Sequence, residues 1–337
     1  MAAPNGLSEV ARQYRKKHGK EMPTKKLARI MYNENKLLFK DEEHARARLR
    51  YIEGKSANGK NKASVKNSEF FMAEDRPKNP YNLPESYKED RQPIKLPVAN
   101  NNILLISDLH IPYHDINAIT TALDYGVQNK VNTVICNGDV LDFHGLSKFQ
   151  HDPRKRSVKE EFDAAKEFLI VLRNTFPDAL IWWIKGNHCI RYEHWLMTKV
   201  KEVFDDDYYH LENRLRLNEQ KIRIIDDKVL VKAGKLSITH GHHIMKGFFS
   251  PVNSARGVYM KAKQSTIIGH VHKVSTHSET NMDGKVITTW STGSLCELKP
   301  DYSPLVSNYQ HGFAHIEVEK NGDYTVKNYQ IINGKLH

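Results

Sequence analysis

Apolar and polar positions recur with two different periods along this chain of 337 residues. Short apolar runs rich in Val and Ile predict buried strands, whereas longer segments with an apolar residue every three or four positions predict amphipathic helices. From residue 101 onward the two kinds of segment alternate, which is typical of βαβ units and a largely parallel sheet. The expected strands are 103–106, 133–136, 180–184, 222–225, 229–231, 236–239 and 266–268, and the expected helices are 116–128, 157–176 and 253–263.

The last part of the chain changes to hairpins. Turns at Met282–Gly284 and Asn321–Gly322 predict two antiparallel pairs of strands. Parallel strands followed by antiparallel strands indicate two sheets packed face to face, with helices on the outside. We expect a polar helical insertion at 191–217 and a loop at 241–256 to provide substrate specificity or an oligomer contact.

A basic helical region precedes this domain. Residues 1–55 predict short helices, of which the third leaves Arg46, Arg48 and Arg50 largely outward. The region is either a nucleic-acid binder of the helix-turn-helix type or a small basic cap whose charges only keep it solvated. Residues 56–97 are rich in Gly, Ser, Asn, Lys and Pro and predict a flexible linker or a strap, so the larger domain is expected at 98–337.

Charge and composition restrict the partners and the compartment. Residues 1–95 hold 22 Lys/Arg against 13 Asp/Glu, so +9 of the total charge of +11 belongs to them. An anionic partner such as nucleic acid would therefore meet this region first. The absence of a long apolar run and of a signal-type segment predicts a cytoplasmic protein that does not contact a membrane. Three cysteines without a CxxC pair predict reduced thiols.

Polar clusters follow five of the predicted strands directly. They are Asp108–His110, Asn137–Asp139, Gly186–His188, His240–His243 and Gly269–His272. One such cluster is more often a capped turn than a ligand, but a structural role does not explain five of them. Oxygen and imidazole ligands without cysteine suit Mn, Fe, Zn or a similar divalent cation. Two such cations share an anionic ligand, and Asp139 is the natural bridge.

The motifs DLH, GDVLD, GNH, HGH and GHVH, in this order, resemble the signature of the calcineurin-like metallophosphoesterases over about residues 101–320. The resemblance implies an α/β fold, a four-layer α-β-β-α sandwich with a dinuclear metal site at one edge. It also implies the ligands: Asp108, His110 and His272 for the first cation, Asp139 as the bridge, and Asn187, His240 and His270 for the second. A later stretch, 293–313, resembles a subgroup found in phages and bacteria.

The same resemblance gives roles to residues beside the ligands. His188 matches the histidine that acts on the leaving group, and Asp142 matches the carboxylate that orients it. The arginine that follows this carboxylate in Ser/Thr protein phosphatases is replaced by Phe143. Arg191 either substitutes for it on the phosphate or faces solvent, and His242 contacts either the phosphate or a carboxylate behind the ligands.

The sequence therefore predicts a metal-dependent hydrolase of phosphomonoesters or phosphodiesters. The localised positive charge and the missing arginine favour a nuclease or nucleotide phosphodiesterase over a protein phosphatase. The alternative is a nucleic-acid-binding protein that uses the phosphoesterase domain as a scaffold. The expected cofactor is a pair of divalent cations, with Mn as the first choice and Fe, Zn, Ni or Mg as alternatives.

Overall fold

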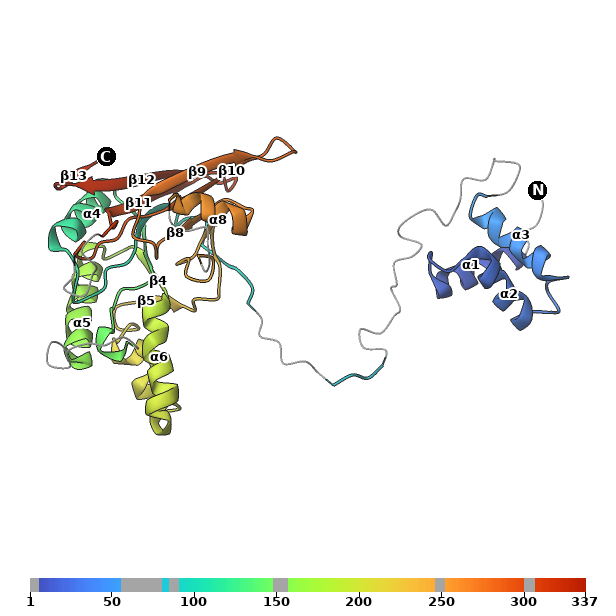
Figure 1. The fold of residues 1–337 in the computed structure, drawn as a ribbon, viewed down its shortest axis with the longest axis horizontal. Coiled ribbons are helices and arrows are strands. Elements are labelled where there is room, and N and C mark those ends of the chain that lie inside the picture. Colours follow the sequence, from blue (N-terminus) through green and yellow to red (C-terminus); the bar gives the residue numbers. More distant parts are fainter. Residues whose placement is uncertain (1–5, 56–80, 85–90, 148–156, 246–251, 300–306) are drawn as a thin grey trace. The chain divides into compact units, whose positions relative to one another are not determined.

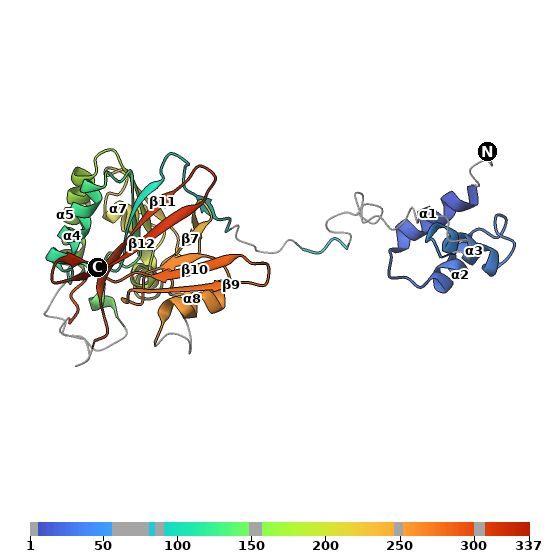
Figure 2. The same cartoon turned by 90° about the horizontal axis from the view of Figure 1, so that it is seen from above.

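The chain divides into two compact units, Met1–Lys88 and Glu89–His337, and each is described by itself. The computed structural model describes residues 6–55, 81–84, 91–147, 157–245, 252–299 and 307–337 (Figures 1 and 2). The linker expected at 56–97 falls largely on residues 56–80 and 85–90, outside the described residues. Its last part, Ile94–Lys95, is strand β1 of the second unit.

The first unit consists of helices α1 (Gly6–His18), α2 (Thr24–Glu34) and α3 (Glu42–Ile52). The side chain of Asp41 accepts a hydrogen bond from the backbone N–H of His44 (2.7 Å), which fixes the start of α3. One apolar side of each helix is buried against the other two, and the buried residues are Ala11, Leu27, Ala28, Met31, Phe39, Ala45, Leu49 and Ile52. Beside this core, Arg15 of α1 forms a buried ion pair with Glu53.

The second unit contains two sheets. The larger sheet has the strand order β13-β12-β11-β2-β3-β4-β5, in which β2 to β5 are parallel and β11 to β13 are antiparallel. The smaller sheet has the order β1-β6-β7-β8-β10-β9. The strands of the larger sheet are β2 (Asn102–Ile106), β3 (Thr133–Asn137), β4 (Leu180–Ile184), β5 (Ile222–Ile225), β11 (His311–Val318), β12 (Tyr324–Ile332) and β13 (Lys335–Leu336). Those of the smaller sheet, besides β1, are β6 (Val231–Ala233), β7 (Leu236–Ile238), β8 (Thr266–Ile268), β9 (Ser275–Thr280) and β10 (Val286–Ser291).

Both faces of the larger sheet are buried at its central strands β2, β3 and β4, and alternate residues divide between the two faces. In β2, Ile103 and Leu105 join the apolar layer between the two sheets. Leu104 and Ile106 face the other way, into the layer under the helices. Those helices are α4 (Ile116–Gln128), α5 (Val158–Thr175) and α6 (Asn187–Lys199), and α8 (Ser254–Ala262) packs on the smaller sheet (Figures 1 and 2). The predicted four-layer α-β-β-α sandwich is confirmed.

The boundaries of several elements differ from the sequence prediction. The strand expected at 229–231 begins only at Val231, because the N–H of Val229 closes a turn on the carbonyl of Asp226. The first part of the insertion expected at 191–217 is the continuation of α6. Two 3-10 turns, at 201–203 and 207–209, and a short helix, α7 (Leu211–Arg214), follow it. Residues 246–251 of the expected specificity loop lie outside the described residues. No helix in the described part of the chain has the length and the apolar character needed to cross a bilayer.

Candidate metal centre

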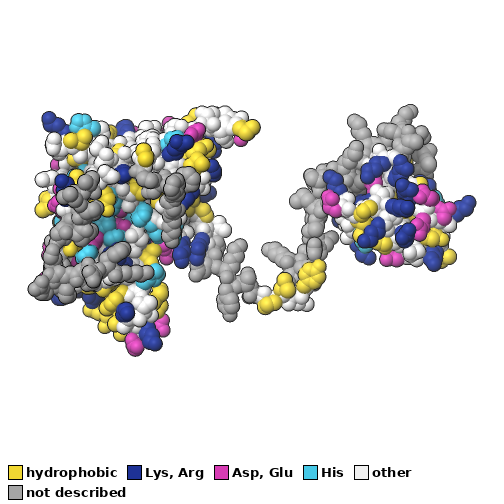
Figure 3. Space-filling view, in the orientation of Figure 1, with side chains coloured by type: hydrophobic (Ala, Val, Ile, Leu, Met, Phe, Trp, Pro, Cys, Tyr) yellow, Lys and Arg dark blue, Asp and Glu magenta, His cyan; other side chains and the backbone are white. Residues whose placement is uncertain are grey.

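The predicted polar clusters lie at the carboxyl ends of parallel strands. β2, β3 and β4 are hydrogen-bonded neighbours in one sheet, and β7 and β8 are neighbours in the other. Because parallel strands end at the same edge of a sheet, the residues that follow them converge there. Figure 3 shows histidine side chains gathered on one face of the second unit.

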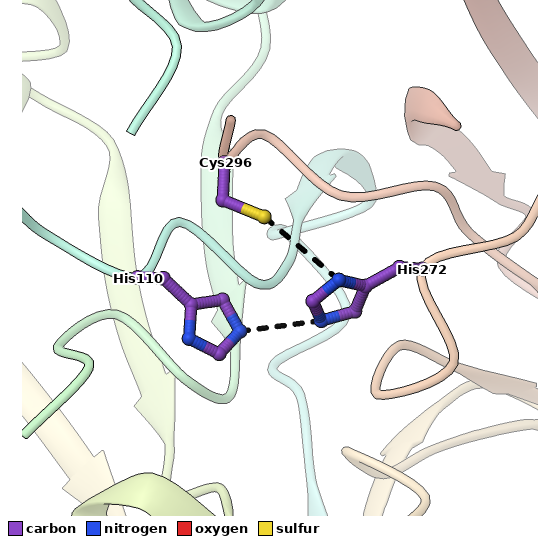
Figure 4. A group of neighbouring side chains, drawn as sticks. All are labelled: His110, His272 and Cys296. Carbon is purple, nitrogen blue, oxygen red and sulfur yellow. Dashed lines mark hydrogen bonds between the residues drawn. The ribbon is translucent and has the colours of Figure 1, made fainter. Parts of the chain in front are cut away.

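The first subset of predicted ligands comes from β2 and β8. The Nε2 atom of His272 is 3.2 Å from Oδ1 of Asp108 and 3.2 Å from Nε2 of His110. His110 Nε2 is itself 3.8 Å from the same carboxylate oxygen. All three side chains are buried. Two ring nitrogens and one carboxylate oxygen therefore face a common point, with His110 and His272 pointing toward each other in Figure 4.

The second subset comes from β3, β4, β7 and β8. Nε2 of His240 lies 3.0 Å from Oδ2 of Asp139 and 3.2 Å from Oδ1 of Asn187. The ring of His270 is 5.2 Å from the ring of His240, centroid to centroid. Nε2 of His240 is also 4.0 Å from Oδ1 of Asp108, so this atom lies between the two subsets. The structure thus brings together every side chain that the sequence predicts as a metal ligand.

Unpaired polar atoms show that the residues present fit a pair of cations. Oδ1 of Asp108 is fully buried and has no hydrogen-bond partner among the described residues, although three ring nitrogens lie within 4.0 Å. A buried carboxylate oxygen without a partner is costly unless a cation binds it. At His110 and His272, two ring nitrogens lie 3.2 Å apart, close enough for one cation to bind both. Asp, Asn and His are the ligand types that divalent transition metals accept.

Several residues of the site have a strained backbone conformation. A positive φ is uncommon outside glycine and costs on the order of 1 kcal/mol or more per residue. The site residues with a positive φ are Asp108 (57°), His110 (51°), Asp139 (47°), His270 (68°) and His272 (53°). Strain of this kind persists where the surrounding fold holds side chains in place for a function.

The electrostatics keep both carboxylates ionised. Burial raises the pKa of Asp108, but the imidazoles of His272 and His240 reverse this effect and hold the pKa well below its ordinary value. Burial likewise raises the pKa of Asp139, and His240 and His188 hold it well below the ordinary value. Burial lowers the pKa of His270 to about 4, which leaves a neutral imidazole with a lone pair for a cation. His272 has a pKa raised to about 9, because Asp108 outweighs the effect of burial.

The two predicted catalytic residues lie beside the second subset. Nδ1 of His188 is 2.6 Å from the backbone carbonyl oxygen of Asp142 and 3.3 Å from its carboxylate Oδ1. Nε2 of His188 lies 4.0 Å from Oδ2 of Asp139. The carboxylate of Asp142 is closer to another partner, Nδ1 of His110, at 2.8 Å. Asp142 therefore contacts the predicted ligand His110 with its side chain and His188 mainly with its backbone.

The two predicted substrate-binding residues, Arg191 and His242, have different partners in the structure. Arg191 lies on the first turns of α6, where Nη1 donates to the backbone carbonyl of Asp142 (3.0 Å) and Nη2 donates to Nε2 of His188 (3.3 Å). It therefore faces the site and not solvent. His242 instead directs Nε2 at the carboxylate of Asp227, 3.1 Å away. Arg46, Arg48 and Arg50 belong to the first unit, in α3.

Three further residues contact the site without having been predicted to do so. Sγ of Cys296 is 3.8 Å from Nδ1 of His272 (Figure 4). The hydroxyl of Ser107 is 2.5 Å from Oδ2 of Asp108. Asp227 accepts from both His242 and His243, and although burial raises its pKa, these hydrogen bonds bring it below its ordinary value. The adjacent histidines at 242 and 243 indicated a polar contact, but the spacing of residues along the chain could not identify Asp227 as the partner.

Comparison with known proteins places the chain in a family. A profile of the calcineurin-like phosphoesterases matches residues 102–290, which is more than half of the chain. The chain belongs to this family. The gene 54 protein of Mycobacterium phage L5 is 25% identical over 238 residues, covering 65% of this phosphoesterase chain and 90% of the phage protein. The gene 54 protein of Mycobacterium phage D29 is also 25% identical, over 235 residues, covering 66% of this chain and 91% of that protein.

Solved structures that the chain matches include the phosphoesterase Yfce from E. coli and the nuclease MPE from Pseudomonas putida. The first is 16% identical and covers 67% of this chain and 98% of that chain, with a TM-score of 0.32. The second is 13% identical and covers 68% of this chain and 92% of that chain, with a TM-score of 0.28.

Proposed function

We propose that this calcineurin-like phosphoesterase hydrolyses phosphate esters at a dinuclear metal centre. The observation that supports the proposal most directly is the convergence of Asp108, Asp139 and His240. Nε2 of His240 lies within 4.0 Å of a carboxylate oxygen of each aspartate, although the three residues follow different strands. Asp108, His110 and His272 would hold one cation and Asn187, His240 and His270 the other, with Asp139 shared between them. Mn²⁺ is our first choice among the divalent cations.

When bound, such cations polarise a phosphoester and lower the pKa of water. The chain's own residues have three tasks. The two aspartates supply the negative charge that holds the centre together, and the imidazoles supply ring nitrogens that bind a cation in place of a proton. Buried apolar residues on both sides of the strand ends, such as Ile106 and Ile268, exclude bulk water, which strengthens each electrostatic interaction in the site.

His188 is the residue we propose as the proton donor to the leaving oxygen. Its Nδ1–H is placed to donate to the carbonyl of Asp142, so this bond fixes the ring, and Nε2 faces Arg191. To act as the donor, the ring takes up a second proton, on Nε2, in place of the hydrogen bond from Arg191. Its backbone N–H donates to Oδ1 of Asp139 (2.9 Å), which ties the start of α6 to the bridging carboxylate. A proton transferred from Nε2 to the departing oxygen makes that oxygen a better leaving group.

Arg191 is the residue we propose for binding the phosphate. Its guanidinium contacts Nε2 of His188, so it lies where a phosphoryl oxygen approaches the proton donor. Arginine recognises phosphate through two parallel N–H groups. Arg191 therefore provides the charge that the arginine after the GDxxD motif provides in protein phosphatases, where this chain has Phe143.

A substrate comparison tests the proposal. The full chain, loaded with Mn²⁺, is assayed on p-nitrophenyl phosphate, bis-p-nitrophenyl phosphate, cyclic nucleotides and single-stranded DNA. We expect hydrolysis of at least one of them that is lost with a chelator, with the diesters preferred. Metal-loaded protein that is inactive on all four substrates would contradict the enzymatic proposal.

Nucleic acid is the substrate class we propose, because of the charge of the first unit. Residues 6–55 hold 14 Lys/Arg and 7 Asp/Glu. Arg50 of α3 is exposed, and Arg46 is partly exposed beside Glu43 (2.8 Å). Exposed arginines on a helix of a small basic unit are suited to phosphate contacts.

Binding of labelled DNA or RNA by the full chain tests this part. Replacement of Arg46, Arg48 and Arg50 by Ala should weaken binding and make its salt dependence less steep, because fewer counterions are released. Metal content should be unchanged. Wild-type protein that does not bind nucleic acid even at low salt would remove nucleic acid as a partner.

A further inference from the structure

A second group of side chains of the types that bind metals lies next to the candidate metal centre. It consists of Asp227, in the turn after β5, and of His242 and His243, directly after His240 and Gly241. We call these three residues the Asp227 cluster. One ligand atom from each lies within 4.8 Å of the others. None of the three belongs to the ligand set that the family motifs imply.

The side chains of the Asp227 cluster point toward one another. Nε2 of His242 is 3.1 Å and Nε2 of His243 is 2.5 Å from the same oxygen, Oδ2 of Asp227. The two rings are 3.9 Å apart, centroid to centroid. In the described part of the chain, each ring hydrogen-bonds through Nε2 to Asp227, so this carboxylate orients both nitrogens. Two imidazoles and a carboxylate facing one point form a set that divalent transition metals accept, with positions left open for other ligands.

The burial of the cluster matches a site with one open side. The side chains of Asp227 and His242 are 4% and 8% exposed, whereas that of His243 is 40% exposed. An ion could therefore enter past His243. The cluster is also close to the second subset, since the ring of His242 is 5.5 Å from that of His240 and 6.1 Å from that of His270.

We propose that Asp227, His242 and His243 bind a third divalent transition-metal ion. Its place beside the second subset would add positive charge for a further phosphate oxygen of the substrate. This role rests on the proposed function, but the binding of the ion does not.

The third ion should be the most weakly held. Three side chains would bind it, whereas each cation of the dinuclear centre would have four side-chain ligands, counting the shared Asp139. Coordination through Nε2 also places the ring proton of His242 on Nδ1, which is buried and has no partner among the described residues. We expect a chelator to remove this ion first.

Counting of bound zinc tests the proposal. Full-length chain without an affinity tag is stripped of metal, loaded with Zn²⁺, separated from free metal by gel filtration and analysed for zinc by mass spectrometry. We expect about three ions per wild-type chain and about two after Asp227→Asn or His243→Ala, since each variant removes one ligand. His243→Ala changes a partly exposed ring and so tests binding without disturbing the core.

A matched control is His277→Ala, because His277 also contacts a carboxylate, that of Glu279 (3.1 Å), but belongs to no group of three metal-ligand side chains among the described residues. This variant should keep about three ions. About two ions in the wild type, unchanged in the Asp227→Asn and His243→Ala variants, would overturn the third site and leave the dinuclear centre standing. Three ions in every variant would overturn it as well, by showing zinc bound elsewhere. A wild type without zinc would instead contradict the proposed function.

Discussion

At the scale of single residues, the histidines of the centre differ in what supports them from behind. Nδ1 of His110 contacts the carboxylate of Asp142 (2.8 Å), and Nδ1 of His240 contacts the backbone carbonyl of Asn137 (2.8 Å). Nδ1 of His272 has a sulfur partner, Cys296, at 3.8 Å. A ligand histidine that binds a cation through Nε2 carries its proton on Nδ1, so the acceptor there fixes the tautomer and the ring orientation.

Replacement of Cys296 tests this support. Cys296→Ala removes the acceptor, and we expect the affinity for one cation of the centre to fall by about 10-fold, at the lower end of what such partners contribute. Cys296→Ser keeps an acceptor and should lose less. The measurement is competition for Mn²⁺ with a fluorescent chelator. Equal affinity in wild type and Cys296→Ala would show that the sulfur does not position His272.

Replacement of His188 tests the proton donor. His188→Asn removes the donor while Asp139 and the metal ligands remain, so we expect kcat on a cyclic nucleotide, whose alkoxide leaving group needs a proton, to fall by about 10²–10⁴-fold. Metal content should not change. His194→Asn, an exposed position on the same helix, is the control and should keep full activity. A loss of metal that parallels the loss of activity would assign His188 to the centre itself.

At the scale of elements, glycines at the strand ends allow the close approach of the two sheets. Gly138, between β3 and Asp139, has φ of +91°, and a Cβ atom there would overlap the imidazole of His240. Gly284, in the hairpin turn between β9 and β10, has φ of +76° with open space around it. The two positions share the backbone conformation but differ in what surrounds them.

Alanine at each glycine separates these two effects. Both variants should lose about 1 kcal/mol or more of stability, because alanine disfavours a positive φ. Only Gly138→Ala should also lose metal, since its methyl group displaces His240. Thermal unfolding and metal analysis check the two expectations. Gly138→Ala protein that keeps its full metal content would contradict the close packing of β3 against His240.

The pattern of apolar and polar residues was sufficient to predict most strands of the sandwich, because a buried strand such as β8 is a short run of apolar and β-branched residues. It placed β6 two residues too early, since the turn at Asp226 and Val229 depends on a backbone hydrogen bond that leaves no pattern in the sequence. Candidate ligands such as Asp108 follow strands directly, so their place at the strand ends could be predicted. The contacts of Asp227 and Cys296 could not, because they join loops whose meeting depends on the packing of both sheets.

At the scale of the whole molecule, a buried histidine makes folding sensitive to pH. His315 of β11 is buried, with Nδ1 2.9 Å from the hydroxyl of Tyr125 and Nε2 2.7 Å from Oδ1 of Asn102. Burial lowers its pKa. The unfolded chain therefore binds a proton at this residue at a higher pH than the folded chain does. Its contribution to stability is complete above about pH 6.5, the ordinary histidine pKa, and is lost as the pH falls.

Urea unfolding of the metal-free chain between pH 7.5 and pH 5 measures this effect. The difference in unfolding free energy between wild type and His315→Gln should shrink as the pH falls, because glutamine takes up no proton. Comparison of the two proteins cancels the contributions of the other histidines, which act in both directions. A difference that is constant with pH would contradict the effect of burial on His315.

The central claim is that side chains from separate strand ends bind a pair of divalent cations, and a crystal of the full chain soaked in Mn²⁺ tests it most directly. The measurement is an anomalous difference map at the manganese absorption edge. We predict two strong peaks beside Asp139, one contacting Asp108, His110 and His272 and the other Asn187, His240 and His270. A map without peaks at these side chains, from crystals that contain Mn²⁺ at saturating concentration, would contradict the account.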